Sequence, residues 1–147
     1  MKEALEEFYR EPEKEAVFHI YDQLVKCYVF NLECAIPLVN HQGQLLPEAF
    51  MLEQAGGLYN AVFTSGEGLE LSEGVGAQIT GFRTALKNSS VGWKTLGMVL
   101  DLSKTRPSVC VSTETVREII RVAENQISDL PLKYRKAILN IHPGDHE

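Results

Sequence analysis

The sequence predicts an α+β domain with a mixed or antiparallel sheet of about four to six strands and helices packed mainly on one face. Two apolar segments, 96–102 and 108–112, are joined by a short polar connection ending in Pro107. This pattern is typical of an antiparallel hairpin. A long amphipathic segment follows, and further strand-like and helix-like segments precede the hairpin. We therefore expect the rest of the chain to pack onto this hairpin and helix.

Residues 96–102 have the pattern of an interior strand. Alternate side chains of a strand point to opposite faces. One face carries only apolar residues, and the other is apolar until Asp101 near the end. A strand covered on both faces shows this composition.

The segment after the hairpin is predicted to be a helix. Ser112 or Thr113 can cap it, with Glu114 in its first turn near the positive end of the helix dipole. Apolar residues recur at helical spacing on one face. They are Val116, Ile119, Ile120, Ala123 and Ile127.

Two helices are expected before the first strand. Residues 1–10 can form a short helix, and Pro12 suits the first turn of a second one. Residues 28–32 are rich in aromatic and β-branched residues, which favours a strand. Residues 35–39 continue extended, with Pro37 marking a sheet edge.

Turn residues and hydrophobic periodicity predict the remaining segments. In order, the sequence predicts a turn at 40–43, a loop with a short helical turn at 45–58, a strand at 58–64, a short strand at 75–80, a short helix at 82–86, a loop at 88–92, a last helix beginning near Pro131, and a polar tail from His142. The chain is expected to be one domain over 1–147, with residues 1–12 as an N-terminal extension and 128–147 as a C-terminal helix and tail.

The net charge of −6 argues against nucleic-acid and anionic-membrane partners, which select clustered lysine and arginine. The acidic excess is strongest before residue 16, where six glutamates face three basic residues. The N-terminus has no basic-then-apolar signal pattern, and no apolar run is long enough to span a bilayer. We therefore expect a cytoplasmic protein.

The sequence does not match known catalytic or metal-binding motifs. The glycines between Gly66 and Gly76 match neither nucleotide-binding pattern, and Ser65 is not in a GxSxG elbow. Pro143 and Gly144 separate His142 from His146 and forbid a helical metal pair. We expect no catalytic residue, no metal and no cofactor.

Three cysteines form no CxxC pair and are expected to be free thiols: Cys27, Cys34 and Cys110. Asp101 is the most interesting carboxylate, because it lies on a nearly apolar strand. We expect it to lie where the strand frays into solvent, whereas a buried Asp101 would need a partner such as Arg106, Arg83 or Lys104.

The order of segments resembles the N-terminal domain of the SseB-like (enhanced serine sensitivity) bacterial proteins. The resemblance covers roughly 16–125 and is carried by Phe63-Thr64-Ser65 before Gly-Glu-Gly-Leu, by the apolar strand 96–102, and by the helix entered at Glu114. This chain has Asp101-Leu102 where the family has Asn-Pro, and an insertion at 45–57. The resemblance implies an α+β domain of bacterial origin, without established catalytic residues, that serves as a regulatory or protein-binding module. Related domains resemble immunity proteins that bind one basic toxin.

Function is therefore expected to be protein–protein interaction with a basic partner. The alternatives are a small ligand-binding protein or enzyme with a pocket near Ser65 and Asp101, and a homodimer that buries Phe8, Tyr9 and Phe18. The candidate binding residues are Phe63, Ser65, Trp93, Asp101 and Arg106.

Overall fold

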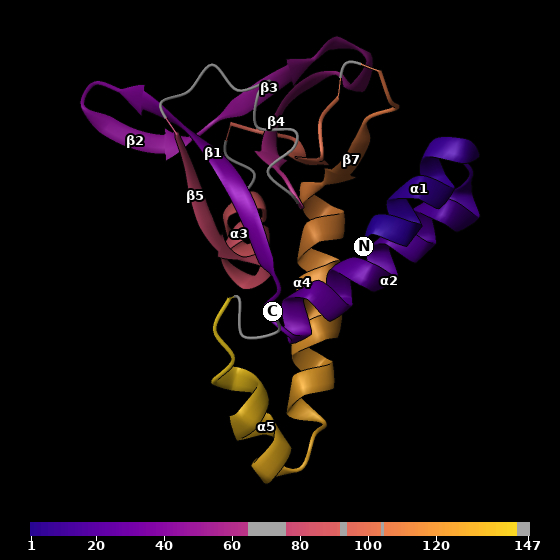
Figure 1. The fold of residues 1–147 in the computed structure, drawn as a ribbon, viewed down its shortest axis with the longest axis vertical. Coiled ribbons are helices and arrows are strands. Elements are labelled where there is room, and N and C mark those ends of the chain that lie inside the picture. The colour runs from indigo at the N-terminus through magenta and orange to yellow at the C-terminus, as the bar shows by residue number, and fades with distance from the viewer. Residues whose placement is uncertain (65–75, 92–93, 104, 144–147) are drawn as a thin grey trace.

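The computed structural model describes residues 1–64, 76–91, 94–103 and 105–143, and Figure 1 shows their arrangement. Within these residues the chain is α+β, as predicted, with five α-helices and seven strands in two open sheets. The elements are α1 (Lys2–Arg10), α2 (Lys14–Val29), β1 (Glu33–His41), β2 (Gln44–Pro47), β3 (Ala49–Leu52), the 3-10 turn η1 (Glu53–Ala55), β4 (Gly57–Val62), β5 (Gly76–Gly81), α3 (Phe82–Ser89), β6 (Gly97–Leu100), β7 (Val109–Ser112), α4 (Thr113–Ser128) and α5 (Leu132–Leu139).

The strands divide between two sheets, a division that the sequence did not indicate. One sheet has the order β2-β1-β5 and is antiparallel. The other has the order β3-β4-β6-β7, in which β4 and β6 are parallel and the other pairs antiparallel. Ala35 and Phe63 exchange backbone hydrogen bonds of 2.8 and 2.9 Å and link the two sheets.

The predicted strand–turn–strand–helix unit is confirmed. All four residues of β6 are buried, and β6 lies between β4 and β7. Ser112 is the N-cap of α4, and its hydroxyl accepts a hydrogen bond from the Thr115 N–H. Of the five apolar residues predicted to face the core, Ile120 is partly buried and the other four are buried.

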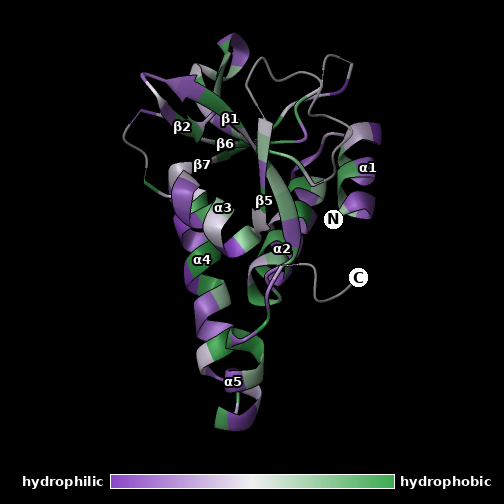
Figure 2. Ribbon diagram, turned by 60° about the vertical axis from the view of Figure 1, so that its left-hand side comes forward, coloured by the Kyte–Doolittle hydropathy of each residue, from purple (hydrophilic) through white to green (hydrophobic). Residues whose placement is uncertain are grey.

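Helices cover one face of the strands. The larger hydrophobic cluster joins residues of α1, α2, α3 and α4 to apolar side chains of both sheets. Hydrophobic and hydrophilic residues alternate around α4, as expected of an amphipathic helix on a sheet (Figure 2). A smaller cluster lies on the opposite face and includes Tyr59, Phe63 and Val99, with Leu52 and Cys110 packed against it.

Residues 28–32 do not form the predicted strand. Tyr28 and Val29 complete α2, and the chain turns through Asn31, whose φ is +49°. The Tyr28 hydroxyl donates a 2.7 Å hydrogen bond to Glu124 of α4, so tertiary contacts favour helix here. The intrinsic strand preference of Tyr28 and Val29 is therefore overridden.

Pro37 does not mark a sheet edge, because β1 is the central strand of its sheet. Alternate residues of a strand direct their N–H groups to the same side. The Ala35 N–H donates to the Phe63 carbonyl, and Pro37 is two residues further along the strand. The missing N–H of Pro37 therefore lies on the same side as the Phe63 bridge. On that side, pairing with β2 begins only at Leu38. A central strand tolerates proline at this gap in the ladder.

The segment 45–58 is more regular than predicted. It forms β2, β3 and η1, and only η1 corresponds to the expected helical turn. A tight turn with Gln42 at φ +53° and Gly43 at φ +85° connects β1 to β2. All four residues of β2 are exposed, so β2 lacks the alternation that would have revealed it.

Strands β4 and β5 lie at the expected segments, and α3 begins at Phe82 as predicted. Helix α3 extends through Ser89, so the loop predicted at 88–92 is wrong for its first two residues. Pro131 is the N-cap of α5 rather than its first residue. No helix in the described ranges is long and apolar enough to cross a membrane.

Candidate binding groove

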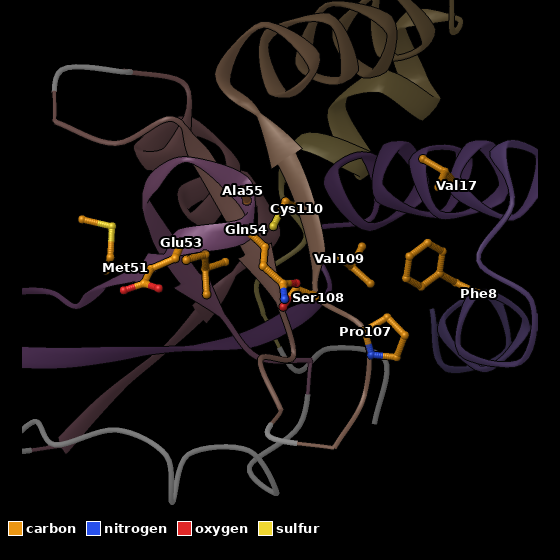
Figure 3. Close-up of a pocket in the computed structure, with 11 residues that line it drawn as sticks. Phe8, Val17, Met51, Glu53, Gln54, Ala55, Pro107, Ser108, Val109 and Cys110 are labelled. Atoms are coloured by element: carbon orange, nitrogen blue, oxygen red, sulfur yellow. The ribbon is translucent and has the colours of Figure 1, made fainter.

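A groove of about 700 Å³ lies beside the start of β7 (Figure 3). Phe8 and Val17 of the N-terminal helices line one side, and residues 51–55 of β3 and η1 line the other. Residues 107–110 lie between them. The lining is mainly apolar and comes from segments far apart in the sequence.

The helical wall is formed by the amphipathic pair α1 and α2. Phe8 is buried in the larger cluster, and Val17 is partly buried against it. The imidazole Nδ1 of His19 on α2 lies 2.9 Å from the carboxylate of Glu7 on α1. This ion pair joins the two helices next to the residues that line the groove.

We predict that the ion pair between His19 and Glu7 responds to pH. The hydrogen bond and negative charge of Glu7 raise the pKa of His19 above its ordinary value. A raised folded-state pKa adds stability that is fully present below the unfolded value of ~6.5 and is lost as pH rises through the folded value. NMR titration of the His19 ring should show the raised pKa in the wild type and a value near ordinary in Glu7→Gln. The same pKa in both proteins would contradict the pairing.

The opposite wall is held by η1. The Tyr59 hydroxyl donates a 2.9 Å hydrogen bond to the Ala55 carbonyl, and Gly56, at φ +84°, ends the turn. Leu52 packs on the smaller cluster. Met51 is 61% exposed at the mouth of the groove, and Glu53 is exposed beside it. This wall therefore combines an anchored backbone with adaptable apolar side chains.

The thiols differ in their environment. Burial raises the pKa of Cys27 to about 11, and burial together with the neighbouring Cys27 raises that of Cys34 to about 12. Cys110 is half-buried and lines the groove, and its pKa is raised by burial.

We predict that iodoacetamide at mildly alkaline pH alkylates Cys110 of the native protein first. Cys27 and Cys34 should react only after unfolding, because buried thiols with raised pKa values hold little thiolate. Peptide mass spectrometry of the alkylated protein checks this order. Early reaction of Cys27 or Cys34 would show that the helix layer opens readily.

The residues predicted to form a site lie in different surroundings. Phe63 is fully buried and packs in the smaller cluster. Ser65 and Trp93 lie outside the described residues. The Arg106 guanidinium carbon lies 5.0 Å from the centre of the Tyr9 ring. Burial and then the charge of Asp101 raise the pKa of Tyr9, while Arg106 opposes them.

Asp101 joins the ends of two parallel strands. It follows β6 with φ +45°, and its N–H donates to the Val62 carbonyl of β4. Its carboxylate accepts hydrogen bonds from the Thr64 N–H, at 2.7 Å, and from the Thr64 hydroxyl. Arg83, one of its proposed partners, instead hydrogen-bonds the carbonyls of residues in α2 and α5. Asp101 therefore has a structural role at this strand end.

The sequence did not reveal the groove. Met51 and Val109 were predicted to belong to a loop and a strand, and nothing local places them near Phe8. The run Phe50-Met51-Leu52 was the available signal, because three apolar residues in a supposed loop indicate packing or binding.

No protein-family model, curated protein or solved structure matches this chain. Within the described residues no group of three or more His, Cys, Asp or Glu side chains could hold a metal ion. Function is therefore inferred from the groove.

Proposed function

We propose that this protein is a non-enzymatic protein-binding module, as its resemblance to SseB-like domains implies, and that the groove beside β7 receives the partner. The observation that supports this proposal is an apolar groove built from three separate parts of the chain with an exposed methionine at its mouth. Apolar patches with a polar rim are typical of protein interaction sites. Methionine adapts its shape to different apolar partners.

The charge of the chain favours a basic partner. A net charge of −6 attracts cationic surfaces and accelerates their encounter with the protein. An immunity protein that neutralises a basic toxin would be one member of this class.

The alternative of a homodimer involved Phe8, Tyr9 and Phe18. Phe8 is buried within the chain, and Phe18, which is 50% exposed, is the most accessible of the three.

The test is affinity capture from a lysate of the source organism with matched variants. Wild-type protein, Met51→Arg and Ile79→Arg are immobilised, and bound proteins are eluted with a salt step and identified by mass spectrometry. Met51 and Ile79 are 61% and 58% exposed, so the fold should tolerate both substitutions, but only Met51 lines the groove. Circular dichroism confirms that each variant is folded.

We predict a protein retained by wild type and Ile79→Arg and lost from Met51→Arg. A positive charge at the mouth of an apolar groove would be desolvated by the partner without compensation. Release at higher salt would support a basic partner. Equal retention by both variants would move the binding site away from the groove, and no retention by any of them would contradict the proposed function.

A further inference from the structure

We infer that the groove receives an extended basic segment of the partner, which adds to the sheet as a strand beside β7. This inference rests on the proposed function and specifies its partner. It follows from the backbone of β7, the two sides of the groove and the acidic charge beside it.

The edge of β7 presents unpaired backbone groups to the groove. β7 is the last strand of its sheet among the described residues. The Thr113 N–H donates to the Leu96 carbonyl, so Val111 and Val109 also direct their backbone groups toward β6. The N–H and C=O groups of Cys110, between them, therefore point away from β6. An edge of this kind is a template for a further strand.

The two sides of the groove suit the alternation of a strand. Val109 belongs to the larger cluster with Phe8, and Cys110 packs on the smaller cluster with Ala55. A strand added beside β7 would point successive side chains to these two sides in turn. Both sides are apolar, so apolar residues fit at successive positions in the centre of the segment.

The charge beside the groove is acidic. Glu53 lines the η1 side and is exposed. The first 15 residues, which include Phe8 of the helical side, carry six glutamates and three basic residues, and the whole chain has a net charge of −6. The neighbouring Arg106 is stacked on Tyr9. Lysine or arginine flanking the apolar centre of the segment would therefore be favoured.

The test begins with a phage-displayed library of random nine-residue peptides selected on the full-length protein. We predict enriched peptides with central apolar residues, flanking lysine or arginine, and no proline in the centre. The best peptide is synthesised in two further forms, in which alternate backbone amides are N-methylated at odd or at even central positions. In a strand, only one of these sets faces β7.

One methylated set should weaken binding to wild-type protein about tenfold or more, and the other should bind nearly as well as the parent. Cys110→Pro should also weaken the parent peptide, because it removes the outward N–H without removing a bond to β6, while Cys110→Ser controls for the side chain. Equal effects of both methylated sets, or an acidic consensus, would overturn strand addition. The affinity capture from lysate then separates the two proposals. If Met51→Arg still abolishes capture of the partner, the groove remains the binding site, and only the inference of an extended basic segment is wrong.

Discussion

Replacing Gly97 with alanine should destabilise the protein by about 3 kcal/mol or more, a large part of the ~5–15 kcal/mol that stabilises a typical domain. Gly97 opens β6 with φ +154°, which side chains rarely adopt. A Cβ atom there would lie 1.9 Å from the Val111 carbonyl oxygen and 2.8 Å from the Ser112 Cα. These are backbone atoms of β7, so the clash is relieved only by separating the two strands.

Urea denaturation of wild type and Gly97→Ala measures this effect. Gly76→Ala in β5 is the matched control, because a Cβ atom at Gly76 meets nothing within 4 Å and its φ is not positive. The control should stay within about 0.5 kcal/mol of wild type. A Gly97→Ala protein as stable as the control would show that β6 and β7 are not packed as described.

Replacing Arg83 with methionine should cost about 2–4 kcal/mol and release α5 before the rest of the fold. The Arg83 guanidinium donates to the carbonyls of Tyr28 and Val29 at the end of α2, at 3.0 and 2.7 Å. It also donates to the carbonyl of Ile138 in α5, at 2.9 Å. Carbonyls at helix C-terminal ends lack partners within the helix, and a cation there is favourable. One side chain therefore joins two helix ends, and methionine satisfies neither.

Hydrogen exchange followed by mass spectrometry checks this prediction peptide by peptide. Faster exchange should appear first in α5 and then at the end of α2, with the β6–β7 hairpin unchanged at first. Arg117→Met is the control, because Arg117 donates one exposed hydrogen bond to the Ser90 carbonyl. Its effect should be small. If α5 exchanges at the same rate in Arg83→Met as in wild type, other contacts hold α5.

The sequence predicted most accurately the parts of the fold whose residues interact with close neighbours. The hairpin 96–112 and the helix after it were predicted because alternation, a turn and a cap all agree within one segment. Strand β2 was missed because its residues are exposed and carry no alternation. The predicted strand at 28–32 was wrong because contacts with α4 extend α2 through Val29. Such contacts join residues that only the folded chain brings together.

The candidate site depended on the same long-range information. Asp101 was expected to lie where the strand frays into solvent, but its carboxylate is held by Thr64. Thr64 is 37 residues away and becomes a neighbour only through the parallel pairing of β4 and β6. The groove is harder still, because Val17, Met51 and Val109 belong to three elements. Their local patterns describe how each segment folds, and only the tertiary structure shows that they enclose one space.

Site-specific photo-crosslinking tests the central claim, that the groove beside β7 is the partner surface, most directly. A benzophenone amino acid is placed at position 51 in one protein and at position 79 in another, since Met51 and Ile79 are similarly exposed and only Met51 lines the groove. Irradiation in cells of the source organism should give a discrete crosslinked protein from position 51 and none from position 79. The same crosslinked protein from position 79, with none from position 51, would contradict the account.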